Sequence, residues 1–86
     1  MLLMNKVPEK PHELSDNAFT VLIEAYRYFE KNDAYFTDFS TLDFPREELE
    51  RCFLELHKKL YVFWEDRGKE NECLYILDNP LLDNFL

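Results

Sequence analysis

The stretch DFPREELERCFLELHKKLYVFWEDRG, from Asp43 to Gly68, carries the clearest structural signals in this chain. Pro45 suits the first position of a helix, where its missing N–H costs nothing. Lys58 and Lys59 would then close the last turn, where the helix dipole favours cations. Apolar residues repeat at helical spacing along the same segment and predict one buried stripe: Leu49, Cys52, Phe53, Leu56 and Leu60. We therefore expect a helix over residues 45–59, with Phe53 and Leu56 at the centre of the core.

The residues after this helix predict a β-hairpin. LYVFWE, at 60–65, is β-branched and aromatic, so a strand is expected to begin near Leu60 or Tyr61. DRGKEN contains Gly68, the single glycine of the chain, at a turn where a positive φ is expected. ECLYILD, at 72–78, then supplies the second strand.

The residues before Asp43 predict one long helix and two short elements. Ser15 or Asp16 offers an N-cap oxygen, and a regular apolar stripe follows it: Phe19, Leu22, Ile23, Tyr26 and Phe29. AYF, at 34–36, is expected to be an edge strand. TDFSTL is expected to form a short helix that directs Phe39 and Leu42 inward.

These elements together predict a small α+β domain in the order helix, short strand, short helix, helix, β-hairpin. A chain of 86 residues allows one domain. Residues 1–13 contain two prolines and are expected to be an extended arm, which is either a frayed terminus or a strap onto a partner. The domain is expected to span 14–80, and an apolar tail to follow at 81–86.

The segment FSTLDFPREELERCFLELHKKLYVF gives this order of elements a generic resemblance to the winged helix-turn-helix fold, over about residues 15–78. In winged-helix repressors the second long helix often ends in a glycine, where this chain has Leu60. The resemblance implies DNA binding through the start of that helix and the wing. The cations at those positions are Arg46, Arg51, Arg67 and Lys69.

The distribution of charge disfavours DNA as the ligand. The chain has 18 acidic and 10 basic residues, a formal net charge of −8. Residues 45–59 contain four basic and four acidic residues, and residues 65–72 contain two basic and four acidic residues. Affinity for DNA depends mainly on cations that neutralise phosphates, and no basic stripe is visible in the sequence.

The same charge favours a protein partner, either a basic protein or one whose nucleic-acid groove an acidic domain can occupy as a DNA mimic. The expected binding face combines the helix over 45–59 with the wing. Its residues are Glu47, Glu50, Leu54, Glu55 and Asp66, with Trp64 as an anchor if its side chain is exposed. Packing of Trp64 into the core is the favoured alternative. DNA binding by a transcriptional regulator remains the alternative function.

The chain shows no sequence motif for catalysis, so we expect a protein that is not an enzyme and needs no cofactor. Its two cysteines and two histidines lack the short paired spacings of a zinc site, and both cysteines are expected to be reduced thiols in the core. No signal peptide and no apolar run long enough for a membrane span is visible. We therefore expect a cytoplasmic protein.

The C-terminal segment PLLDNFL is too apolar for an idle tail. Packing over the core of the same chain is slightly favoured, and a homodimer contact is the alternative. The residues concerned are Leu81, Leu82, Phe85 and Leu86.

Overall fold

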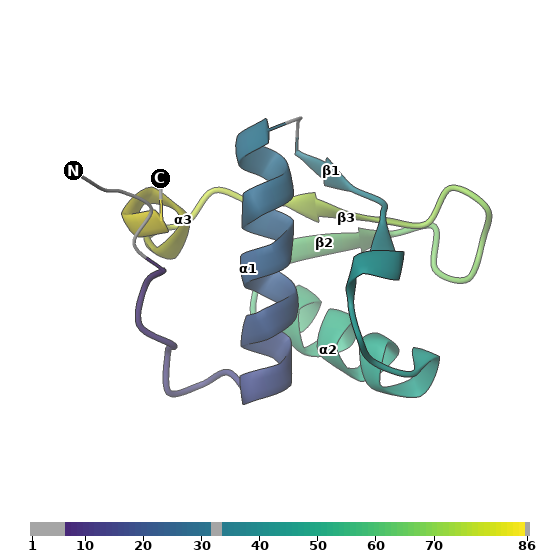
Figure 1. Ribbon diagram of the computed structural model, residues 1–86, viewed down its shortest axis with the longest axis horizontal. Coiled ribbons are helices and arrows are strands. Elements are labelled where there is room, and N and C mark those ends of the chain that lie inside the picture. The colour runs from purple at the N-terminus through teal and green to yellow at the C-terminus, as the bar shows by residue number, and fades with distance from the viewer. Residues whose placement is uncertain (1–6, 32–33, 86) are drawn as a thin grey trace.

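The segment that dominates the sequence forms helix α2, Arg46–Lys58, which packs beside α1, Asp16–Lys31 (Figure 1). The computed structural model describes residues 7–31 and 34–85. The remaining elements among these residues are strand β1 (Tyr35–Phe36), 3-10 helix η1 (Phe39–Thr41), strands β2 (Val62–Glu65) and β3 (Cys73–Ile76), and helix α3 (Pro80–Phe85). The predicted α+β class and the predicted order of elements as far as the hairpin are therefore confirmed.

The buried side of α2 follows the predicted stripe over most of its length. Leu49, Cys52, Phe53 and Leu56 are all buried, and the rings of Phe39 and Trp64 pack on Phe53 at centroid distances of 4.8 and 5.4 Å. Two details of the prediction were wrong. Pro45 is the N-cap with extended backbone angles, so the helix begins one residue later. Leu60 is not buried, since its side chain is 70% exposed.

The exposure of Leu60 follows from the way α2 ends. Leu60 has a φ of 65°, its N–H donates to the carbonyl of His57, and the N–H of Tyr61 donates to the carbonyl of Leu56. This pair of hydrogen bonds is the Schellman motif, which reverses the chain through a left-handed residue. The left-handed residue leaves the helical periodicity, so β2 begins at Val62 instead of near Leu60 or Tyr61.

Ser15 caps α1 and also connects it to α2. Its Oγ accepts a hydrogen bond from the N–H of Ala18 at 3.2 Å. The carboxylate of Glu55 accepts two further hydrogen bonds from Ser15, at 2.7 Å from the backbone N–H and at 2.9 Å from Oγ. Of the predicted stripe on α1, Leu22, Ile23 and Tyr26 are buried, and Phe19 and Phe29 pack against the core while partly exposed.

The three strands form an antiparallel sheet in the order β1-β3-β2, so the last strand lies between the other two. The side chains of Val62, Trp64, Leu74 and Ile76 are buried and belong to the core. The predicted packing of Trp64 into the core is confirmed. Gly68 in the turn between β2 and β3 has a φ of 69°, as predicted.

The C-terminal segment forms helix α3 instead of a tail. Leu82 and Phe85 are buried in the core of the chain, and the ring of Phe85 lies 5.6 Å from that of Tyr26. Leu81 is partly buried against the same cluster, and Leu86 lies outside the described residues. The favoured prediction, that this segment packs on the chain's own core, is confirmed for the described side chains.

The described part of the N-terminal arm, residues 7–13, lies against the body of the protein. Glu13 accepts a hydrogen bond from the hydroxyl of Tyr61 at 2.7 Å through its carboxylate, and its carbonyl accepts one from Lys59 Nζ. Lys10 Nζ donates to the carbonyl of Leu14 at 2.8 Å. The two hydrogen bonds of Glu13 connect the arm to the region where α2 ends and β2 begins. Residues 1–6 lie outside the described part of the chain.

Candidate functional site

The face of the sheet that points away from α1 and α2 carries a row of aromatic side chains. Cross-strand register places Tyr35 of β1 opposite Tyr75 of β3, and Tyr75 opposite Phe63 of β2. The rings of Tyr35 and Tyr75 meet edge to face at 4.9 Å. Tyr35 is 48% exposed and Phe63 is 49% exposed, whereas Tyr75 between them is half-buried. We call this surface, formed by Tyr35, Phe63 and Tyr75, the aromatic row.

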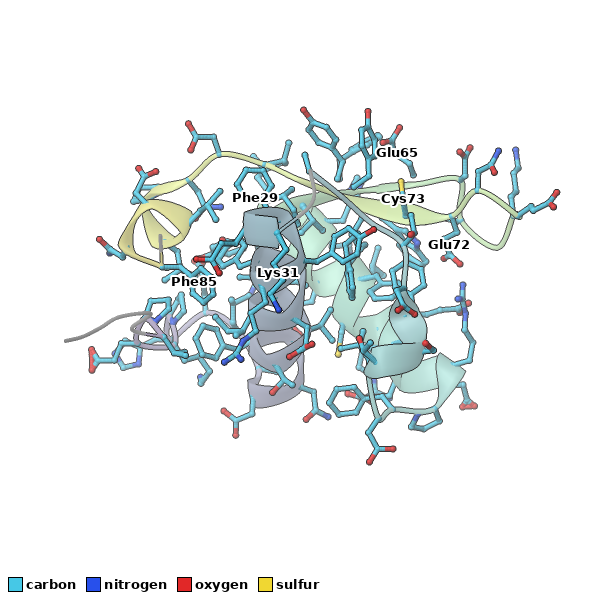
Figure 2. The ribbon with its side chains drawn as sticks, turned by 45° about the horizontal axis from the view of Figure 1, so that its top comes forward. Phe29, Lys31, Glu65, Glu72, Cys73 and Phe85 are labelled. Carbon is cyan, nitrogen blue, oxygen red and sulfur yellow. The ribbon has the colours of Figure 1, made fainter. Side chains whose placement is uncertain are left out.

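A shallow pocket of about 410 Å³ lies beside the aromatic row, toward the turn between β2 and β3. Tyr35 belongs to both features. Four carboxylates line the pocket: those of Glu65, Asp66, Glu70 and Glu72. Its other lining residues are Thr37, Asn71 and Cys73. Among the described residues that line it, none is a lysine or arginine. Figure 2 shows Glu65 and Cys73 pointing to the side of the sheet away from the helices. We call this feature the acidic pocket.

Glu72 differs from the other carboxylates because its charge is used within the fold. Its side chain is 9% exposed, and Oε2 accepts hydrogen bonds at 2.7 Å from both Arg46 and Trp64 Nε1. Burial on its own would raise the pKa of the Glu72 carboxyl. Hydrogen bonds from Arg46, Trp64 and the backbone of Gly68 outweigh this effect, so its pKa lies below the ordinary value. Glu72 thereby connects α2, β2 and the turn.

The remaining carboxylates of the acidic pocket face solvent without a cation. Within residues 7–31 and 34–85, no ion pair joins Glu65, Asp66 or Glu70 to a lysine or arginine. Asp66 and Glu70 are exposed, and Glu65 is half-buried. Burial raises the pKa of the neighbouring Cys73 thiol, and the charges of Glu65 and Asp66 raise it further. A raised pKa keeps this thiol protonated and unreactive.

The protein-binding residues expected from the sequence do not come together on one surface. Glu47 and Glu50 are exposed on α2, and Glu50 is paired with Arg46 at 2.7 Å. Leu54 is half-buried against the core, and Glu55 accepts its two hydrogen bonds from Ser15. The remaining two lie in the hairpin: Trp64 is buried, and Asp66 lines the acidic pocket.

Three of the four cations expected from the winged-helix resemblance have partners within the fold. Arg46 forms ion pairs with Glu50 and Glu72, and hydrogen bonds from its guanidinium to these two carboxylates raise its pKa. Arg51 Nη1 lies 3.5 Å from Glu48 Oε1. The other two expected cations lie in the turn: the guanidinium of Arg67 stacks 4.4 Å from the ring of Trp64, and Lys69 is exposed.

His57, near the end of α2, is half-buried. Its Nδ1 accepts a hydrogen bond from the backbone N–H of Trp64 at 3.2 Å, and its ring lies 5.1 Å from that of Phe63. The imidazole therefore closes part of the outer edge of β2 and supports one end of the aromatic row. An edge N–H with a side-chain acceptor is less available for pairing with another strand.

The aromatic row and most of the acidic pocket were missed in the sequence, although a signal for them exists. Side chains alternate between the two faces of a strand. Once Val62 and Trp64 are assigned to the core, Phe63 and Glu65 must lie on the opposite face, and Tyr75 follows in the same way from Leu74 and Ile76. The contribution of Tyr35 has no such local signal, because it depends on the order of the strands.

No group of three potential ligands lies close enough together to hold a metal ion in the part of the chain that the structure describes. A second shallow pocket lies between α1 and η1 and contains both cations and carboxylates: Glu24, Arg27, Lys31 and Asp38. Its mixed charge does not favour one class of ligand.

No protein-family model, curated protein or solved structure matches this chain. Over residues 7–31 and 34–85, none of the helices has both the length and the apolar character that a membrane crossing requires.

Proposed function

We propose that this chain is a non-enzymatic interaction domain that binds another protein through the aromatic row and its surroundings. The observation that carries the proposal is the exposure of Tyr35 and Phe63 on the face of the sheet that points away from α1 and α2. Half-exposed aromatic side chains in one row offer the large, rigid contact area that is enriched at protein interfaces. Their neighbours on the same strands fill the core, whereas Tyr35, Phe63 and Tyr75 do not belong to the core cluster among the described residues.

The order of elements and the sheet order β1-β3-β2 support a winged-helix-like architecture for this domain. η1 has only three residues, where that fold has a full second helix. Fold alone does not determine the ligand.

Nucleic acid is the main competing ligand, and the distribution of charge disfavours it. Aromatic residues on an open sheet can stack unpaired bases, as in some RNA-binding domains. Such a site also needs cations for the phosphates, whereas this aromatic row adjoins four carboxylates. Duplex DNA meets the same difficulty on α2, because Arg46 and Arg51 are paired with glutamates.

A photo-cross-linking experiment tests this proposal. A photo-reactive phenylalanine analogue in place of Phe63 is expected to capture a discrete partner protein in cells of the source organism. The same analogue in place of Glu47, which is exposed on α2, and in place of Glu9, on the arm, supplies the controls. Capture of the same protein from all three positions would indicate non-specific contact.

A titration with mixed-sequence duplex DNA and with single-stranded RNA at low salt completes the test. Cationic contacts to phosphate are strongest at low salt. The proposal predicts no saturable binding under these conditions. Tight binding that weakens steeply with added salt would overturn it and direct attention to Arg46, Arg51, Arg67 and Lys69.

A further inference from the structure

Given the proposed function, on which this inference rests, we propose that the partner is a basic segment of another protein. A lysine or arginine of that segment enters the acidic pocket, and an adjacent apolar side chain covers the aromatic row. The charge of the pocket identifies the partner's chemistry, and the aromatic row provides the contact area.

The two features are continuous because Tyr35 belongs to both. One edge of its ring meets Tyr75 in the aromatic row, and Tyr35 also lines the pocket with the carboxylates. A guanidinium that enters the pocket would lie near the Tyr35 ring and near carboxylate oxygens at the same time. Arginine is suited to such a site because its planar group stacks on aromatic rings and pairs with carboxylates through two hydrogen bonds.

The charges available for a partner are those that the fold does not use. Glu72 is neutralised by Arg46, but Glu65, Asp66 and Glu70 have no ion pair within the described residues. These three unpaired charges lie on one side of the aromatic row, so they favour a cationic partner and orient it. The net charge of −8 would also speed the approach of a basic protein.

A second copy of this chain is a poor occupant of the same face. In a two-fold dimer formed through the aromatic rows, the acidic pocket of each copy would lie at or beside the interface. The two copies would therefore bring carboxylates of like charge near one another. Like charges placed opposite each other at an interface weaken association. A basic segment removes this repulsion, whereas a second copy increases it.

Selection from a displayed library of short random peptides, with the full chain as bait, tests the inference. We expect the bound peptides to be enriched in arginine or lysine next to an aromatic or aliphatic residue. Glu70→Lys places a like charge at the pocket and is expected to weaken a selected peptide by about tenfold or more. Glu9→Lys makes the same change in net charge on the arm and is expected to leave the affinity within about twofold of the wild type.

Phe63→Ser separates failure of this inference from failure of the proposed function. The selected peptides could instead be neutral or acidic and bind the Phe63→Ser variant more weakly than the wild type. That result would overturn the basic partner and leave the interaction surface in place. Absence of any selected peptide, or equal loss with Glu70→Lys and Glu9→Lys, would overturn the inference. Concentration-dependent dimers that disappear with Phe63→Ser would overturn it in favour of self-association. Circular dichroism on each variant confirms that it is folded.

Discussion

Glu72 accepts a hydrogen bond from the indole Nε1 of Trp64 at 2.7 Å, and the same carboxylate oxygen is 2.7 Å from Arg46 Nη2. These hydrogen bonds help to hold the hairpin on the body of the domain. Trp64 is the only tryptophan, and its ring packs on Phe53 of α2. Two charged side chains thus attach the turn that carries the acidic pocket to Trp64: Glu72 through its hydrogen bond and Arg67 through stacking.

The Glu72 network predicts an acid-sensitive contribution to stability. Its pKa is lowered in the folded protein, so this contribution is fully present above the ordinary value of 4.5 and is lost as the pH falls below it. Glu72→Gln retains an oxygen for the Trp64 indole but loses the charge. We expect it to lower the free energy of unfolding at neutral pH by about 1 kcal/mol, the difference between charged and neutral hydrogen bonds.

Urea unfolding followed by Trp64 fluorescence, as a function of pH, measures this effect. The difference between the wild type and Glu72→Gln should shrink as the pH falls below 4.5. Glu70→Gln is the matched control, since Glu70 is exposed and has no ion pair among the described residues. A difference that stayed constant with pH would show that the charge of Glu72 does not stabilise the fold.

The left-handed conformation of Leu60 predicts that a glycine stabilises this position. A residue with a side chain at φ 65° is strained, whereas glycine adopts this angle freely. Leu60 is mostly exposed, so removing its side chain sacrifices little packing. Leu60→Gly should raise the free energy of unfolding by about 1 kcal/mol.

Thermal and urea unfolding of Leu60→Gly, compared with Lys58→Gly, test this prediction. Lys58 is the last residue of α2 and is exposed, so a glycine there should destabilise the helix by about 0.5–1 kcal/mol. A loss of stability from Leu60→Gly would mean that the Leu60 side chain makes a contact of its own.

Replacing a buried and a half-exposed phenylalanine is expected to reduce stability by different amounts. Phe53 is completely buried, and Phe53→Ala should cost about 3–5 kcal/mol through lost burial and the cavity that remains. Phe63 is half-exposed on the outer face, and Phe63→Ala should cost less than about 1.5 kcal/mol. Equal losses of stability would show that the outer face is covered in solution.

Because Phe85 is buried against Tyr26 of the same chain, we expect a monomer whose own core includes α3. Phe85→Ala should lower the free energy of unfolding by about 3 kcal/mol, because Phe85 is part of the core. The melting temperature of the wild type should not change with protein concentration. A melting temperature that rises with concentration, together with a dimer by light scattering, would instead assign α3 to the homodimer contact.

Local periodicity was enough to predict the two long helices and the hairpin. Phe53 and Leu56 follow from the 3.6-residue spacing, and Gly68 follows from the need for a positive φ. The spacing failed at Leu60 because the Schellman turn ends the helix without the glycine that usually marks it. The lysines at 58 and 59 marked the end of the helix, but a leucine gives no local sign of the left-handed conformation that removes it from the buried stripe.

The candidate site was less predictable because it depends on contacts between distant segments. Tyr35 reaches the aromatic row only because β3 lies between β1 and β2. In the same way, the ion pair of Arg46 with Glu72 joins residues 26 positions apart. The winged-helix resemblance therefore implied a DNA contact for Arg46 but gave no sign of its ion pair with Glu72 in the hairpin.

We propose that the aromatic row and the acidic pocket together form the binding surface. Two-dimensional ¹H–¹⁵N NMR of the full chain, titrated with a peptide selected from the library, tests this proposal. We expect chemical-shift changes centred on Tyr35, Phe63, Glu65 and Tyr75 and on the turn that follows β2. Changes centred on α2 at Glu47 and Glu50, or on the mixed-charge pocket at Arg27 and Lys31, would contradict it.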